Sequence, residues 1–122
     1  MKKLLIIEDE ESLRKAIHDK LDDKGISFLE AKNGEEGLST ALKEHPDLIL
    51  LDIILPKMDG FITLEKLRLD NWGKEAKVII LTNLSDKKYI LDSFRNEVYD
   101  YIVKTDIKID DLVAKIKAKL AQ

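Results

Sequence analysis

The 122-residue sequence carries 21 basic and 24 acidic side chains, a formal net charge of −3, and is 44% hydrophobic and 37% charged. This balance is typical of one soluble globular domain and excludes a disordered or membrane-embedded chain. The basic residues form no block, which argues against direct nucleic-acid binding, and the lack of cysteine excludes thiolate metal sites and favours the reducing cytoplasm.

The first third of the chain predicts a strand, a helix and a second strand. Residues 4–7, LLII, form an apolar run typical of a strand buried on both faces, and residues 26–31, ISFLEA, form a weaker one. The first run is shorter than the roughly 7–15 residues of a signal-peptide core, so we expect mature protein from the start. Between the two runs, one apolar face predicts a helix that Lys24 and Gly25 can stop. That face consists of Leu13, Ala16, Ile17 and Leu21.

The middle of the chain continues the alternation. Asn33 can cap a second helix, which His45 and Pro46 must end because the residue before a proline avoids helical geometry. Residues 48–51, LILL, then predict the third strand, and residues 60–69 predict a third helix.

The last third adds two more strands and two more helices. Residues 78–81, VIIL, predict the fourth strand, and Ser85 can cap a fourth helix that runs from Asp86 to about Asn96. Residues 101–103, YIV, predict a short fifth strand, and apolar residues at helical spacing predict the last helix. Those residues are Ile109, Leu112, Val113, Ile116 and Leu120.

Five strand–helix units of this kind predict an α/β fold, in which a doubly wound five-stranded parallel sheet has five helices distributed over both faces. In such a sheet the ligand site lies outside the carboxyl ends of the strands. The residues that follow the strands are therefore the candidates for function. They are Glu8 and Asp9 after the first strand, Asp52 after the third, Thr82 at the end of the fourth and Lys104 after the fifth.

The strand order decides which of these side chains meet. With order 2-1-3-4-5, the first and third strands are neighbours about 4.8 Å apart, so Asp9 and Asp52 can face each other. Lys104 lies two strands beyond Asp52, roughly 9–10 Å away, and its long side chain can cover that distance.

Four segments resemble the response-regulator receiver domain of two-component signalling. "IIEDEE" resembles the family's acidic pair, "LLDIILPKMDG" its phosphoacceptor segment, "LTNL" its switch threonine and "YIVK" its last strand with an aromatic residue and a lysine. The resemblance covers the whole chain and implies a flavodoxin-like fold, with residues 1–122 as one single-domain receiver. It also implies phosphoryl transfer to Asp52 from a histidine kinase or a histidine phosphotransfer protein.

The acidic residues suggest a magnesium site. Carboxylates that converge repel one another at neutral pH unless a cation lies among them, and oxygen-only ligands suit Mg²⁺. Asp9 and Asp52 are expected as direct ligands, with the Ile54 carbonyl as a third if the family geometry holds, while Glu8 is expected to act through water.

The other candidate residues are expected to support transfer and signalling. Asp52 is expected to act as the nucleophile, Lys104 to supply positive charge and the Thr82 hydroxyl to donate to a phosphoryl oxygen. Tyr101 occupies the family's aromatic switch position and is expected to turn inward as Thr82 moves, although it could equally be an ordinary half-buried strand tyrosine. Leu13 is either a core residue or an apolar contact for a kinase.

The sequence departs from the family pattern in three places. The acidic pair is Glu-Asp rather than Asp-Asp, Asn83 stands where a small residue is usual, and Thr105 stands where proline is usual. Because a cis bond before a non-proline residue costs about 2.5–4 kcal/mol, we expect the Lys104–Thr105 bond to be trans.

Other classes fit less well. Dehalogenase-type Mg²⁺-dependent phosphatases need a second Asp two residues after the nucleophile, where this chain has Ile54. A flavodoxin needs amides and hydroxyls after its first strand, where Glu8 and Asp9 would repel a phosphate. A degenerate receiver that acts only as a docking module is the main alternative. We expect a cytoplasmic phosphoprotein that contacts an unknown downstream protein, binds neither nucleic acid nor membrane, and turns over no external substrate.

Overall fold

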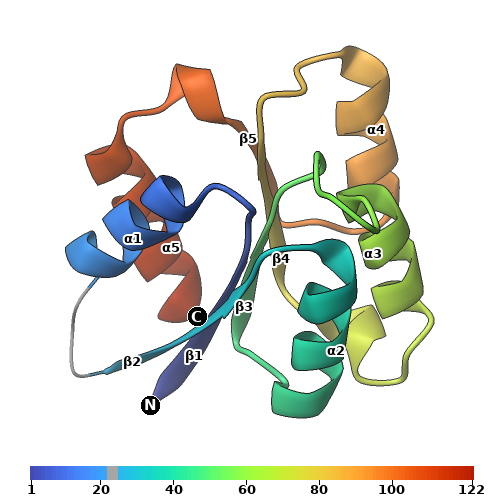
Figure 1. The fold of residues 1–122 in the computed structure, drawn as a ribbon, viewed down its shortest axis with the longest axis horizontal. Coiled ribbons are helices and arrows are strands. Elements are labelled where there is room, and N and C mark those ends of the chain that lie inside the picture. The colour runs from blue at the N-terminus through green and yellow to red at the C-terminus, as the bar shows by residue number, and fades with distance from the viewer. Residues whose placement is uncertain (22–24) are drawn as a thin grey trace.

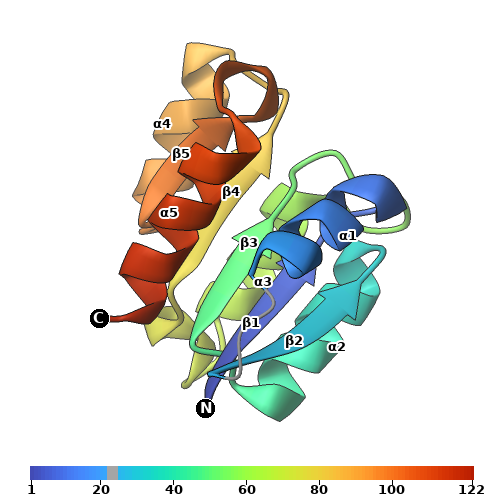
Figure 2. The ribbon, with the colours of Figure 1, turned by 90° about the vertical axis from the view of Figure 1, so that its left-hand side faces the viewer.

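The computed structural model describes residues 1–21 and 25–122, which form a five-stranded parallel sheet with helices on both faces (Figures 1 and 2). The strands lie in the order β2-β1-β3-β4-β5, which confirms the predicted fold class. Their bounds are Lys2–Ile7 (β1), Ile26–Ala31 (β2), Leu48–Leu51 (β3), Val78–Thr82 (β4) and Asp100–Val103 (β5). The α-helices are Glu11–Lys20 (α1), Gly34–Glu44 (α2), Gly60–Arg68 (α3), Lys87–Arg95 (α4) and Ile109–Leu120 (α5), and two 3₁₀-helices span Gly73–Glu75 (η1) and Lys104–Asp106 (η2).

The sheet separates two hydrophobic clusters. Helices α1 and α5 cover one face, and α2, α3 and α4 cover the other (Figures 1 and 2). Along β1, Leu4 and Ile6 enter the cluster under α1 and α5, whereas Leu5 and Ile7 enter the cluster on the opposite face. All four side chains are at most 2% exposed, which explains why this strand is apolar without alternation. No helix in the described part of the chain has the length and hydrophobicity needed to span a lipid bilayer.

Local side-chain bonds fix two helix starts. The Asn33 side chain accepts a bond from the Glu36 amide at 2.9 Å, which confirms the predicted cap of α2. Asp59 caps α3 in the same way by accepting from the Ile62 amide at 3.0 Å. Helix α2 ends at Glu44, and its C-cap His45 has left-handed geometry. The end of the helix at this point was predicted from the proline that follows.

Helix α1 ends at Lys20, with Leu21 as its C-cap. Ile17 and Leu21, on the predicted apolar face, are fully buried. Lys24, which together with Gly25 was predicted to stop this helix, lies outside the described residues.

The predicted start of α4 is wrong. Ser85 does not cap the helix, which begins after Asp86, and the Asp86 side chain makes no capping bond. The carbonyl of Leu84 instead accepts a 2.5 Å hydrogen bond from the Tyr101 hydroxyl. A contact from β5 therefore fixes the chain two residues before the N-cap of α4.

Candidate functional site

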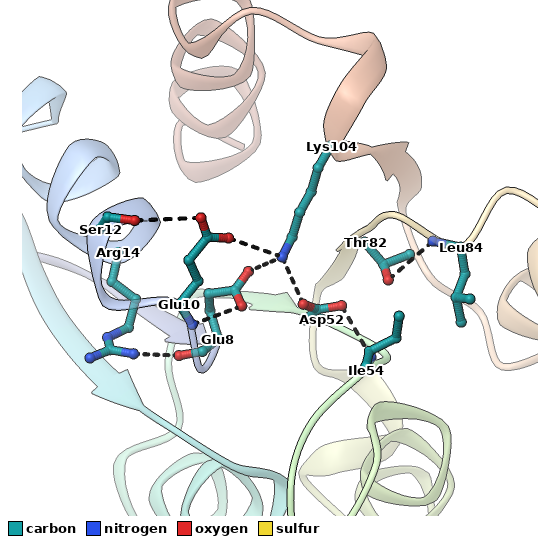
Figure 3. Close-up of polar contacts among 9 residues, drawn as sticks. All are labelled: Glu8, Glu10, Ser12, Arg14, Asp52, Ile54, Thr82, Leu84 and Lys104. Carbon is teal, nitrogen blue, oxygen red and sulfur yellow. Dashed lines mark hydrogen bonds and ion pairs between the residues drawn. The ribbon is translucent and has the colours of Figure 1, made fainter.

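The predicted residues meet at the carboxyl edge of the sheet (Figure 3). Ile7 of β1 pairs in register with Leu51 of β3, and the Asp52 amide donates to the Ile7 carbonyl at 3.0 Å. Glu8 and Asp52, the residues that follow this pair, are thereby placed next to each other. The register of two buried strands, rather than any local signal, brings these two carboxylates together.

Lys104 joins both carboxylates from the end of β5. Its ammonium lies 2.8 Å from Asp52 Oδ2, 2.5 Å from Glu8 Oε1 and 3.9 Å from Glu10 Oε2. Burial lowers the pKa of Lys104, but the hydrogen bonds that its ammonium donates to Asp52 and Glu8, together with their negative charges, outweigh this and raise the pKa overall. Lys104 therefore stays charged at neutral pH. The contact with Asp52 was expected, whereas the short contact with Glu8 was not.

Glu8 is the most perturbed acid of the site. Burial raises its pKa from 4.5 to about 7; the Lys104 hydrogen bond opposes the shift and the Asp52 charge adds to it. Its second oxygen, Oε2, accepts from the Glu10 amide at 3.2 Å. Glu8 Oε1 is thus ion-paired with Lys104, and Oε2 accepts from the Glu10 amide.

The acidic cluster has the donor set of a hard cation. Glu8, Asp9 and Asp52 each offer one carboxylate oxygen, and these oxygens lie within 4.8 Å of one another. Glu8 and Asp52 are buried while Asp9 is exposed, so the cluster opens to solvent on one side. Carboxylate oxygens of this kind suit Mg²⁺. The Ile54 amide donates to Asp52 Oδ1 at 3.1 Å and orients the carboxylate, and the Ile54 side chain is 57% exposed.

Gly60 permits the turn that follows Asp52. A Cβ atom at this position would lie 2.2 Å from the Asp52 carbonyl oxygen, and the Gly60 amide donates to the Ile53 carbonyl at 2.8 Å. The turn therefore packs its backbone directly against the phosphoacceptor candidate, a close approach that only glycine allows.

Thr82 and Tyr101 converge on one residue of the segment that joins β4 to α4. The Thr82 side chain is fully buried, and its hydroxyl oxygen accepts from the Leu84 amide at 3.5 Å. The Tyr101 hydroxyl donates to the Leu84 carbonyl at 2.5 Å. The Tyr101 ring packs against the hydrophobic cluster on the face of the sheet that α2, α3 and α4 cover. Burial and the nearby Asp52 charge raise the Tyr101 pKa, so this donor keeps its proton. The last residue of β4 and a residue of β5 are thus linked through Leu84.

Two further expectations concern residues beside the site. The described chain contains no cis peptide bond, which confirms the predicted trans Lys104–Thr105 bond. Leu13 is partly buried and packs against the core cluster under α1 and α5, which supports its core interpretation.

Sequence reasoning missed Arg14, which is 7% exposed. Its Nη1 donates to the Glu8 carbonyl at 2.6 Å, and its Nε donates to Glu30 at 3.1 Å (Figure 3 shows the first of these bonds). A signal was present, because positions 14, 17 and 21 share one helix face. A charged side chain on the same face as Ile17 and Leu21 indicates a buried partner.

Comparison with known proteins places this chain in a family. The model of the "Response regulator receiver domain" matches residues 4–117. Among curated relatives, the probable transcriptional regulator ycf27 of Porphyridium aerugineum is 36% identical over 97% of this chain and 48% of its own length. The transcriptional regulatory protein DltR of Streptococcus agalactiae is 38% identical over 98% of this chain and 52% of its own. The chain thus spans about half the length of these relatives.

Solved structures agree with the family match. The receiver domain protein (CheY-like) from Methanospirillum hungatei JF-1 superimposes with a TM-score of 0.88 at 30% identity, over 99% of this chain and 94% of that one. A two-component response regulator from Clostridium difficile gives a TM-score of 0.87 at 30% identity, over 100% and 98%. The chain belongs to the response regulator receiver domain family, whose members act in two-component signalling.

Proposed function

We propose that the domain is a phosphorylation-switched receiver, whose Asp52 accepts a phosphoryl group from a histidine kinase or a histidine phosphotransfer protein. The observation that carries the proposal is the 2.8 Å contact between Lys104 and the buried Asp52 carboxylate, beside the cluster of Glu8 and Asp9. This arrangement supports the proposal because it would supply a nucleophile, a cation and a set of oxygens able to hold a metal within one small site.

The transfer step balances when the other ring nitrogen of the phosphohistidine carries a proton. An Asp52 oxygen attacks the phosphorus, a P–O bond forms, the P–N bond breaks, and the ring takes the electron pair of that bond and leaves as neutral imidazole. Lys104 would stabilise the negative charge first on the Asp52 carboxylate and then on the phosphoryl oxygens. The Ile54 amide, bonded to Asp52 Oδ1, holds the carboxylate in place during this change.

A metal ion belongs to the proposal. Asp9, Asp52 and the Ile54 carbonyl would hold Mg²⁺, with Glu8 acting through a water molecule. When bound, the ion supplies positive charge against the phosphoryl oxygens. Glu8 has its oxygens on Lys104 and the Glu10 amide, which suits an indirect role better than direct ligation.

The output rests on Thr82, Leu84 and Tyr101. If the Thr82 hydroxyl turns to donate to a phosphoryl oxygen, its contact with the Leu84 amide changes. The carbonyl of the same residue, Leu84, accepts the hydrogen bond from Tyr101, so the change would reach Tyr101. Phosphorylation would in this way change the surface near α4 and β5, where an unknown downstream protein binds. The relative RpaA of Synechocystis is named as a DNA-binding regulator, an activity of that protein, of which this chain covers 49%. For this domain we propose protein partners and no direct nucleic-acid contact.

Incubation with acetyl phosphate and Mg²⁺, followed by intact-mass measurement, tests the proposal. We expect one added phosphoryl group on the parent and none on Asp52→Asn. A folded parent that gains no phosphoryl group would instead favour the docking-only alternative. Continuous release of inorganic phosphate from a phosphomonoester would favour the phosphatase alternative.

A further inference from the structure

Arg14 is a buried cation beneath the acidic turn, the segment Glu8 to Glu10 that joins β1 to α1. The phosphotransfer chemistry does not use it. It lies in the first half of α1, is 7% exposed, and points its guanidinium at the chain segment that leaves β1 (Figure 3). Its Nη1 bond to the Glu8 carbonyl is 2.6 Å long, which is short for such a bond. The proximity of a second cation to the acidic cluster needs an explanation beyond packing.

The bond completes the anchoring of Glu8. The Glu8 amide donates to the Ala31 carbonyl of β2 at 3.0 Å, and the Arg14 guanidinium binds the Glu8 carbonyl. Both backbone groups of Glu8 are therefore fixed, so the peptide that leads into Asp9 has a set orientation. Since Asp9 is exposed and belongs to the oxygen cluster, the direction of its side chain depends on this peptide.

Glu30 fixes the guanidinium in turn. It accepts from Arg14 Nε at 3.1 Å, and its side chain is 44% exposed. Because the guanidinium is planar and its donors have a rigid geometry, a bond at Nε restricts where Nη1 can point. The series of contacts from Glu30 through Arg14 to the Glu8 carbonyl thus runs from β2 to the backbone of the acidic cluster and does not involve the cluster's carboxylates.

We infer that Arg14 is a positioning residue for the metal site, oriented by Glu30, which sets the backbone from which Glu8 and Asp9 project. The inference rests on the proposed function, since it concerns the ion that the acidic cluster would hold. Groups that orient metal ligands from outside typically change metal affinity by about 10–100-fold when they are removed.

The chain offers a matched control in Arg68. It is likewise a partly buried arginine that donates to backbone carbonyls, those of Asn96, Gly73, Ala76 and Glu97. These carbonyls precede β4 and β5, at the amino edge of the sheet, opposite the site. Arg68→Met therefore removes an arginine with four bonds to backbone carbonyls, more than the two bonds of Arg14, at the edge of the sheet away from the acidic turn.

Isothermal titration with MgCl₂ tests the inference, at a pH above the pKa of Glu8 and a temperature at which circular dichroism shows every variant folded. Arg14→Met should weaken Mg²⁺ binding about tenfold and Glu30→Gln by a smaller factor, while Arg68→Met keeps the parent affinity. Excess Mg²⁺ should return the phosphorylation rate of Arg14→Met with acetyl phosphate towards that of the parent.

Parent-like Mg²⁺ affinity in folded Arg14→Met overturns the inference, as does an equal loss in Arg68→Met. If Arg14→Met does not fold, Arg14→Lys decides, because lysine keeps the charge but lacks the fork that binds two acceptors: weaker binding supports positioning and parent-like binding overturns it. The two proposals fail differently. If the parent binds Mg²⁺ and accepts a phosphoryl group, and Arg14→Met binds Mg²⁺ as tightly as the parent, only the positioning role of Arg14 is refuted. If the parent binds no Mg²⁺, both proposals are refuted.

Discussion

Replacing Glu8 by glutamine should remove a pH dependence of stability that the parent has between about pH 4.5 and pH 7. Glu8 is 2% exposed, and burial raises its pKa from 4.5 to about 7. Between these values the folded protein holds a proton on Glu8 that the unfolded chain has released. The free energy of unfolding therefore falls as the pH rises through this window. Below it both states are protonated and above it both are ionised, so Glu8 adds no slope there.

The size of the effect follows from the two pKa values. At about 1.4 kcal/mol per pH unit, the interval from 4.5 to about 7 corresponds to a loss of roughly 3 kcal/mol between the two ends. Glu8→Gln should lose this slope, although its amide cannot accept from both Lys104 and the Glu10 amide and should cost about 1 kcal/mol for the lost bond. Because the absolute stability shifts for that reason, the slope is the quantity to compare.

Urea denaturation followed by circular dichroism at several pH values, without added metal, measures this slope. Other groups titrate in both proteins, so the difference between parent and Glu8→Gln isolates Glu8. Glu11→Gln, which replaces an exposed acid at the start of α1, should keep the parent profile. Parallel profiles for parent and Glu8→Gln would refute the assignment of a raised pKa to the buried carboxyl group.

Three further outcomes are expected. Asp52→Asn should abolish labelling by acetyl phosphate. The free energy of unfolding should change by less than about 1 kcal/mol, because asparagine keeps a hydrogen-bond acceptor and removes a carboxylate repulsion. Undiminished labelling in the mass spectrum would contradict the assignment of Asp52 as the phosphoacceptor. An Ile54→Asn, Leu84→Glu double variant should lose its phosphoryl group faster than the parent in a decay time course in excess Mg²⁺. The resemblance to receivers implies that these two apolar side chains flank the path of attacking water, which polar groups could orient. Equal rates would count against this. Gly60→Ala should destabilise the protein by about 1–3 kcal/mol, because the new Cβ would lie 2.2 Å from the Asp52 carbonyl oxygen. A thermal unfolding curve that matches the parent would show instead that the turn relaxes to accept the new atom.

The sequence by itself determined the fold and most members of the site. Continuous apolar runs such as Leu4 to Ile7 predict strands buried on both faces, and their alternation with helices allows few topologies other than a parallel sheet. In a parallel sheet all carboxyl ends lie at one edge, so Asp52 and Lys104 could be placed together without coordinates. The Asn33 cap was equally predictable, because the bond joins residues three apart in the chain.

Tertiary structure alone decided how the charges are shared and where the adjoining segments end. Lys104 divides its contacts between Glu8 and Asp52, Arg14 donates to the Glu8 carbonyl, and Tyr101 binds the Leu84 carbonyl just before α4. Each of these contacts joins side chains to partners on other elements, and their geometry depends on rotamers selected by packing. Periodicity and residue type report which face a side chain takes, but not which of several partners it reaches once the core has closed.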